Sequence, residues 1–389
     1  DFRYRLVQLI DHVLEGWRTQ RLRGPFQTDG QAVILEDYLD IRPERRAEVR
    51  RRVREGRLVV GPWYVLPDEF LVSGESLIRN LQLGRSIARE WGGQPSCAGF
   101  VCDEFGHNSQ MPQIFAGFGM RGAFVWRGTN LVDQRLFTWR GADGTDLLTY
   151  RFGPEGYCDY ARFVRACHRK DLPFDPAQAR ANLETFLEAE AAHTPARTLL
   201  LFDGGDHMGW DEEAYAVLLE RMALPDDRLE IVHTSLDAYL AELTAEAPLV
   251  ETVIEGELRE PALHPTHIDH QWLTPGVLAS RVWIKQSNAR CQSLLCQWAE
   301  PCSALAAQAL GREVPQGFLD VAWKALLQNH PHDSISGCSI DAVHEDMKFR
   351  FAQARTLAQR LAREAMQPIA ASVQGTVAEN ELRIAVFNP

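Results

Sequence analysis

Short apolar runs alternate with amphipathic stretches over roughly the first 245 residues of the chain. The runs read RLVVGPWYVL, CAGFVCDEF, GAFVWRG, DLLTYRFG, TLLLFDGGDH and LEIVHTSL, and each stops at glycines, charged residues or a turn. Between several of them lie amphipathic segments such as DPAQARANLETFLEAEAAH and DEEAYAVLLERMAL. Buried strands separated by helices predict an α/β fold, in which helices cover a mostly parallel sheet that is either closed or open. We therefore expect a domain of this kind over residues 1–250.

The pattern changes over residues 272–375, where apolar residues recur at helical spacing and prolines and glycines divide the segment into three parts. This predicts a three-helix bundle. Residues 251–271 are expected to form an irregular linker. The closing ELRIAVFNP alternates like a strand, so 376–389 are expected to hold the first strand of a further β-domain. Since the chain opens on a helix and closes on a new strand, we expect it to be part of a longer protein.

Composition and charge narrow the class of protein. The chain has 389 residues, 45% apolar and 24% charged, as is typical of globular proteins with two or three domains. No stretch reaches the ~18 apolar residues of a membrane span, and the charged, amphipathic start is unlike a signal peptide. A formal net charge of −12 argues against nucleic acid as a partner. The eight cysteines form no CxxC pair, so we interpret them as free thiols of a cytoplasmic protein.

The first candidate for chemistry is Asp103, in the stretch VCDEFGH at the end of an apolar run. In α/β folds, functional residues gather at the carboxyl ends of strands. A carboxylate in this position could be a nucleophile, a metal ligand or both. The alternative is an aspartate that only caps the following helix.

The second candidate is Asp206, which follows two glycines at the end of the strongly apolar run LLLFDGGDH. Glycines allow the backbone to turn sharply and to approach a ligand closely, although an ordinary Gly-Asp turn has the same sequence. Two acids that face one cleft are what glycoside hydrolysis requires. One attacks the sugar or activates water, and the other protonates the leaving oxygen.

The third candidate is the cluster of His330, His332 and Asp333 at the end of a predicted helix. Neutral imidazole and carboxylate both suit zinc, while a polar helix C-terminus is the alternative interpretation. His267 and Asp269 in HPTHIDHQW have similar spacing, but no predicted strand precedes them to hold the pair rigidly. We therefore do not include that pair in the predicted site.

These three segments, in this order, resemble glycoside hydrolase family 38, the zinc-dependent α-mannosidases. The family's nucleophile motif Asp-x-Phe-Gly-His is matched from Asp103 to His107, with Glu104 where many members have proline. Its acid/base aspartate is matched by Asp206, and its later His-Asp motif by His332 and Asp333. GPWYVLPDEFLVSGESLIRN, WRG, SRVWIKQSNARC and RIAVFNP also match, so the resemblance covers nearly the whole chain.

The resemblance implies a seven-stranded β/α barrel, a three-helix bundle and C-terminal β-domains. The first barrel strand would lie ahead of Asp1, with a His-x-Asp motif that supplies two further ligands of a single zinc ion. Asp103 would be both nucleophile and zinc ligand, Asp206 the general acid/base and His332 a second zinc ligand. The residues implied to bind or shape the pocket for the sugar are Phe105, Arg127, His330 and Asp333.

The function that follows is a retaining, zinc-dependent α-mannosidase. Several stretches are more similar to cytoplasmic members, including mannosylglycerate hydrolases, which suggests a small mannoside as substrate. Whether that substrate is phosphorylated and whether the protein is a homo-oligomer stay open. Two other classes also stay open: a metal-dependent carbohydrate deacetylase on a similar barrel, and a non-catalytic carbohydrate-binding protein. Retention of both Asp103 and Asp206 disfavours the second, since a binding module needs no such pair.

Overall fold

The computed structural model describes residues 2–130, 132–166, 173–224, 226, 228–261, 273–375 and 377–388. The chain forms two compact units. Unit 1 comprises Asp1–Leu66 and Leu81–Thr274, and unit 2 comprises Pro67–Asn80 and Pro275–Pro389. The segment Pro67–Asn80 therefore belongs with the C-terminal part of the chain, which the sequence did not predict. The pair His267 and Asp269 lies outside the described residues.

Unit 1 contains a five-stranded sheet with the order β3-β4-β6-β5-β7. Strands β3, β4 and β6 are parallel, whereas β5 is antiparallel to β6 and parallel to β7. Most side chains on these strands are apolar, and every residue of β3 and β4 is buried. The five strands are Ala98–Val101 (β3), Gly122–Val125 (β4), Leu136–Arg140 (β5), Asp146–Arg151 (β6) and Val253–Glu255 (β7).

A separate parallel pair, β1 (Phe26–Gln27) and β2 (Leu58–Val59), completes the strands of unit 1. Four of the six predicted apolar runs thus contain a strand. Across the described chain, no strand is assigned within TLLLFDGGDH or LEIVHTSL, and the strands form two sheets. The seven-stranded barrel therefore stays a prediction. β7 corrects one expectation: part of the linker predicted at 251–271 pairs with β5, since Val253 and Ile254 continue the sheet pattern.

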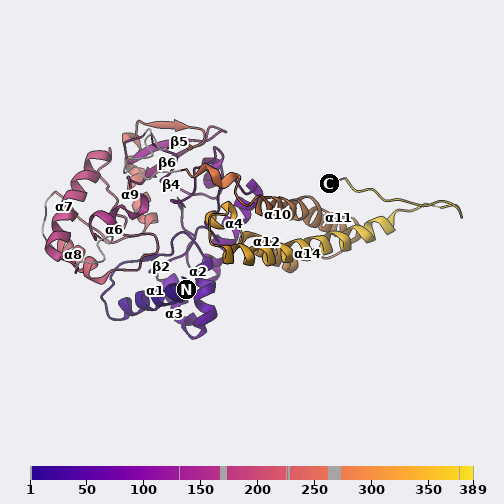
Figure 1. Ribbon diagram of the computed structural model, residues 1–389, viewed down its shortest axis with the longest axis horizontal. Helices are drawn as coiled ribbons and strands as arrows, with labels where there is room; N and C mark the ends of the chain where they lie inside the picture. Colours follow the sequence, from indigo (N-terminus) through magenta and orange to yellow (C-terminus); the bar gives the residue numbers. More distant parts are fainter. Residues whose placement is uncertain are drawn as a thin grey trace. The chain divides into compact units, whose positions relative to one another are not determined.

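Helices α6 to α9 all lie between β6 and β7 in the chain, and α9 packs against β3 (Figure 1). Asp175, Asp211 and Ser235 cap the first backbone N–H groups of α7, α8 and α9, so three helix starts carry a matching cap residue. The helices of unit 1 are α1 (Phe2–Arg18), α2 (Val33–Ile41), α3 (Arg46–Arg54), α5 (Met111–Gly117), α6 (Asp159–Phe163), α7 (Pro176–His193), α8 (Glu212–Met222) and α9 (Leu236–Glu246). Helix α4 (Gly74–Glu90) runs from the segment of unit 2 into unit 1.

Unit 2 is built from helices, and α10, α11 and α12 pack along the long helix α14 (Figure 1). A π-helical turn, Leu294–Ala299, joins α10 to α11. Buried Ala354, Ala358 and Ala362 on α14 allow close approach of the neighbouring helices. The helices are α10 (Val282–Ser293), α11 (Glu300–Leu310), α12 (Gln316–Leu327), α13 (His332–Ser336) and α14 (Asp341–Ser372).

Two further expectations concern the chain end and membranes. Residues 377–388, the described part of the segment expected to open a β-domain, carry no strand. No helix in the described part of the chain combines the length and apolar character needed to cross a membrane.

Candidate active site

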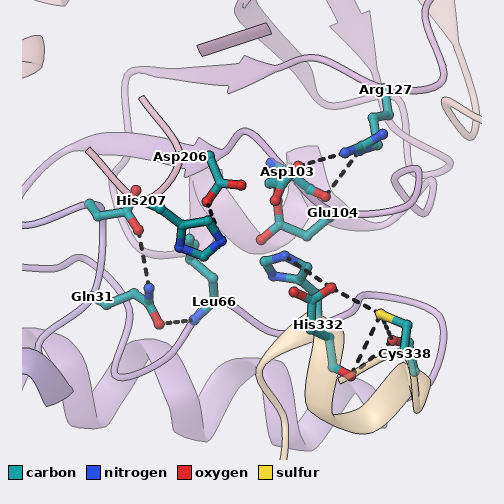
Figure 2. A network of polar contacts seen from close by, with 12 residues as sticks. Gln31, Leu66, Asp103, Glu104, Arg127, Asp206, His207, His332 and Cys338 are labelled. Carbon is teal, nitrogen blue, oxygen red and sulfur yellow. Dashed lines mark hydrogen bonds and ion pairs between the residues drawn. The ribbon is translucent and has the colours of Figure 1, made fainter. Parts of the chain in front are cut away.

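Strands β3 and β4 bring Asp103 and Arg127 together in unit 1. The two strands pair in parallel with Val101 opposite Val125, so the residues two positions further on leave the same edge of the sheet side by side. Arg127 Nη2 donates to Asp103 Oδ1 at 2.7 Å, and Arg127 Nε donates to the Asp103 carbonyl at 3.2 Å (Figure 2). One guanidinium thus fixes both the side chain and the backbone of the predicted nucleophile.

Aromatic rings surround this ion pair. The Arg127 guanidinium carbon lies 4.2 Å from the ring centroid of Trp126 and 5.5 Å from that of Phe105. The Arg127 and Asp103 side chains are 14% and 21% exposed. Rings on the guanidinium restrict its rotation and screen it from water. Phe105 and Arg127, both predicted to contact the sugar, therefore lie next to Asp103.

The four residues after Asp103 are buried. Glu104 is fully buried, and its Oε2 accepts a hydrogen bond from the Asp103 N–H at 3.1 Å. His107 is also fully buried, with its ring edge-to-face to that of Trp139. Gly106 has a φ of +97°, and an added Cβ would lie 3.0 Å from the Leu258 carbonyl. In this motif, the partly exposed acid Asp103 is thus followed by the buried residues Glu104 and His107.

Asp206 lies in a loop of unit 1 with its side chain 57% exposed. Its N–H donates to Cys158 Sγ at 3.2 Å, and its Oδ1 lies 3.4 Å from His207 Nε2. Figure 2 shows the Asp206 carboxylate directed toward Asp103. The two acids predicted from separate segments of the sequence therefore face the same side of unit 1.

Tyr157 is a site residue that the sequence did not reveal. Burial raises the pKa of its hydroxyl, and the nearby carboxylates of Asp103 and Asp206 raise it further. Its ring lies edge-to-face to Trp126, with centroids 6.0 Å apart. The phenol stays protonated and can donate a hydrogen bond near either acid. Tyr157 comes from a single 3-10 turn after β6, and its only signal in the sequence was its place beyond a predicted strand.

The end of β1 reaches the same region, which the sequence did not predict either. Gln31 Nε2 donates to Asp29 Oδ2 at 3.3 Å, and Gln31 Oε1 accepts from the Leu66 N–H at 3.1 Å. Burial raises the pKa of the Cys102 thiol, and the Asp29 carboxylate contributes to the same shift. Asp29 therefore lies close to the end of β3. The strand before it is only two residues long, too short to give an alternating pattern.

His330, predicted to contact the sugar, lies in the interior of unit 2. It is fully buried in unit 2, where its Nε2 lies 2.7 Å from Asn288 Oδ1. Burial lowers the pKa of the imidazole to about 3, so the ring is neutral and donates to the Asn288 oxygen. Asn288 in turn donates to the Leu71 carbonyl. His330 thus packs between segments of unit 2. Its predicted contact with the sugar stays a prediction.

His332 and Asp333 open the short helix α13 of unit 2. His332 is 14% exposed and Asp333 57%, and His332 Nε2 lies 3.8 Å from Asp333 Oδ1. The Cys338 thiol donates to the same Asp333 oxygen at 3.1 Å (Figure 2). Burial raises the pKa of this thiol to about 11, so it remains a donor. The Asp333 carboxylate is thus oriented by a thiol after the helix.

Helix α13 is held at its C-terminal end by residues from the matching stretch SRVWIK. Lys285 Nζ donates to the carbonyls of Ser336 and Ser280 at 2.7 and 2.6 Å, and the Ser280 hydroxyl also donates to the Ser336 carbonyl. Arg281 Nε donates to the Gly337 carbonyl at 3.0 Å. Cations suit a helix C-terminus, where carbonyls lack partners. These contacts fix the turn that carries His332.

The predicted zinc ligands form no complete metal site in unit 1 or unit 2. Over the described residues, no group of three or more His, Cys, Asp or Glu side chains could hold a metal ion. Zinc in proteins takes three or four protein ligands. Asp103 and His332 are of the right chemical type, but two donors are too few. Zinc binding therefore stays a prediction.

Comparison with known proteins identifies the class of this chain. Residues 8–259 match the model described as the glycosyl hydrolases family 38 N-terminal domain, and residues 273–369 match the alpha mannosidase middle domain. The chain belongs to glycoside hydrolase family 38.

Individual relatives agree with this assignment. A protein of Halalkalibacterium halodurans named "Putative mannosylglycerate hydrolase" is 34% identical over 387 residues, covering 95% of this chain and 41% of its own length. The crystal structure of an alpha-mannosidase from Enterococcus faecalis V583 matches with a TM-score of 0.83 and 31% identity, over 95% of this chain and 40% of that one. Human Alpha-mannosidase 2C1 is 24% identical over 89% of this chain and 31% of its own length. The chain thus spans less than half the length of each of these relatives.

Proposed function

We propose that the full-length protein is a retaining α-mannosidase whose catalytic acids lie in this chain. The observation that carries this proposal is the pair Asp103 and Asp206, two partly exposed carboxylates that face the same side of unit 1 (Figure 2). Glycosidases of the retaining type need two carboxyl groups of different function at one site. The two acids have different surroundings, because Arg127 binds the Asp103 carboxylate and Asp206 lies in a loop with its side chain 57% exposed.

In the proposed reaction, an Asp103 oxygen forms a bond to the anomeric carbon as the bond to the leaving oxygen breaks. Asp206, protonated at the start, transfers its proton to that leaving oxygen. It then takes a proton from the water that releases the sugar from Asp103. Arg127 holds the attacking carboxylate in place, and the Tyr157 hydroxyl donates a hydrogen bond close to the developing charge.

Zinc is part of this proposal for the full-length protein. By resemblance to the family, Asp103 and His332 would each supply one ligand, and a His-x-Asp motif elsewhere would supply the others. When bound, zinc acts as a Lewis acid toward the hydroxyls of the sugar. Asp333, oriented by Cys338, would hydrogen-bond the same sugar.

The proposed substrate is mannosylglycerate or another small mannoside, in the cytoplasm. The name of the Halalkalibacterium halodurans relative supports the aglycone. The seven described cysteines are free, which suits a reducing compartment.

A mechanism-based inhibitor tests the proposal most specifically. Incubation of the full-length protein with 5-fluoro-α-mannosyl fluoride should leave a fluoromannosyl group on Asp103, found by mass spectrometry of the digested protein. A carbohydrate deacetylase attacks with water and would carry no label. Label on another residue, or none in a protein that cleaves mannosides, would contradict the assignment of Asp103.

A further inference from the structure

The loop that carries Asp206 has little regular structure of its own. No helix or strand is assigned to residues 203–211, which are all described. Within the loop, the backbone of Met208 donates to the Gly205 carbonyl at 3.3 Å, and His207 has a left-handed φ of +57°. A non-glycine residue in this conformation is strained and needs support from its surroundings. Contacts from outside the loop must therefore decide where the Asp206 carboxylate lies.

Arg165 supplies such contacts at both ends of the loop. Its Nη1 donates to Asp203 Oδ1 at 2.8 Å and its Nη2 donates to the Gly209 carbonyl at 3.1 Å. The same Nη2 lies 3.6 Å from an oxygen of Asp211, which caps α8. Asp206 stands between the two points that this one guanidinium holds.

The surroundings of Arg165 make these contacts strong and specific. Its side chain is only 6% exposed, so little water competes for its donors. Its own backbone N–H donates to the Tyr160 carbonyl of α6 at 3.2 Å, which ties the arginine to a helix. That helix directly follows Cys158, whose sulfur accepts from the Asp206 N–H. The planar guanidinium presents donors in a fixed geometry that a flexible lysine does not reproduce.

We propose that Arg165 is a positioning residue for proton transfer, which closes the loop 203–211 and so fixes Asp206 for its role as general acid and base. This inference rests on the proposed function, in which Asp206 protonates the leaving oxygen. It follows that loss of Arg165 should weaken the steps that need a proton from Asp206. Attack by Asp103, which follows β3 and lies outside this loop, should be affected far less.

The leaving group of the substrate separates these two effects. Methyl α-mannoside needs protonation of its leaving oxygen, whereas 2,4-dinitrophenyl α-mannoside has a leaving group that departs without it. In the full-length protein, Arg165→Gln should lower kcat/KM for the methyl substrate on the order of 100-fold. It should change kcat/KM for the dinitrophenyl substrate by less than about threefold, well short of a general acid/base effect. Added azide, a nucleophile that needs no general base, should speed turnover of the dinitrophenyl substrate. Equal losses on both substrates would overturn the proposal and leave Arg165 a structural residue.

Two matched variants make the result specific. Arg162→Gln removes a half-exposed arginine of α6 that pairs with Glu155, and it should leave both substrates unaffected. Asp206→Ala should show the same dependence on leaving group as Arg165→Gln, but more strongly. If Asp206→Ala shows it and Arg165→Gln does not, the inference about Arg165 fails alone. If Asp206→Ala does not show it, the acid/base assignment itself is wrong.

Arg165 is buried, so its replacement by glutamine could prevent folding. Arg165→Lys retains the charge and can keep one of the two contacts, and Asp203→Asn removes only the ionic contact at the start of the loop. Each should show the same selective loss to a smaller degree, with the unfolding temperature close to that of wild type. Full activity on methyl α-mannoside in both folded variants would contradict the proposal.

Discussion

Individual side chains give the two predicted catalytic acids of unit 1 different surroundings. Arg127 binds the carboxylate and the backbone carbonyl of Asp103, and the Glu104 carboxylate accepts a hydrogen bond from the Asp103 N–H. Asp206 lies in a loop with its side chain 57% exposed, and its Oδ1 is 3.4 Å from His207 Nε2. Burial and the nearby carboxylates of both acids raise the pKa of the Tyr157 hydroxyl. The side chains of this region thus comprise a carboxylate bound by an arginine, a second carboxylate in a loop and a protonated phenol.

The substitution Tyr157→Phe tests the proposed hydrogen bond from the Tyr157 hydroxyl. Removing one preorganised hydrogen bond to developing charge costs on the order of 100-fold in kcat, so we expect a loss of that size on 4-nitrophenyl α-mannoside. The ring stays in place, and the unfolding temperature should hardly change. Tyr4→Phe, at an exposed position of α1, is the control and should retain full activity. Wild-type kcat in Tyr157→Phe would show that the hydroxyl takes no part in the reaction.

Helix α13 shows how one short element carries two predicted residues. Its five residues begin with His332 and Asp333 and end at Ser336, and Gly337 follows with a left-handed φ of +86°. Lys285, Ser280 and Arg281 bind the carbonyls at this end. A helix this short has little stability of its own. Its position therefore depends on the turn at Gly337 and on the residues that cap it.

Gly337→Ala tests that dependence. A residue with a Cβ is strained in the left-handed backbone conformation, at a cost of about 1–2 kcal/mol in free energy of folding. The added Cβ would also lie 2.9 Å from the Ser280 hydroxyl and 3.2 Å from Arg281 Cβ. Gly311→Ala is a matched control, because Gly311 ends α11 with a φ of +64° and has nothing within 4 Å of the added Cβ. We expect Gly337→Ala to lower the midpoint of urea unfolding more than Gly311→Ala. Equal shifts would mean that the contacts around Gly337 contribute nothing.

The sequence predicted the elements whose signals are local and missed those that depend on distant partners. Asp103 and Asp206 follow strongly apolar runs, so the sequence predicted both as acids at the carboxyl ends of strands. Tyr157 lies in a single turn without periodicity. The run before Asp206 is apolar but joins no ladder in the described chain, and apolar composition alone cannot distinguish the two outcomes.

His330 illustrates a second kind of limit. It was grouped with His332 because both lie in one polar stretch, but its partner is Asn288 on another helix. The pairing of Pro67 with Pro331, which brings the segment 67–80 into unit 2, is likewise long-range. No property of one segment records such contacts. The family resemblance supplied the roles of individual residues, which spacing alone did not.

At the scale of the whole molecule, a buried charged network ties the sheet of unit 1 to its helices. Arg135, the residue before β5, forms a bidentate contact with Glu190 of α7. The Tyr150 hydroxyl of β6 donates to the same carboxylate. Asp159 at the start of α6 accepts from the Glu155 N–H and is also buried. Burial raises the pKa of Asp159 from 3.8 to about 7.

This shift predicts how stability depends on pH. Between about pH 4 and pH 7, the folded protein keeps a proton on Asp159 that the unfolded chain releases, so stability falls as pH rises through this range. The size should be on the order of a few kcal/mol. Asp159→Asn, which can still accept from the Glu155 N–H, should remove this part of the pH dependence and raise the unfolding temperature at pH 8. Asp320→Asn, at an exposed position of α12, is the control. An unchanged pH profile in Asp159→Asn would contradict a protonated Asp159.

The central claim is that Asp103 is the nucleophile of a metal-dependent mannosidase. The most direct measurement is hydrolysis of 4-nitrophenyl α-mannoside by the full-length protein, with and without a chelator, beside an Asp103→Asn variant. We predict activity that the chelator removes and added zinc restores, and a loss of at least about 1,000-fold in the variant, as expected when a covalent nucleophile is removed. If the zinc-supplied wild type hydrolyses neither this substrate nor mannosylglycerate, or if Asp103→Asn retains wild-type activity, the account is contradicted.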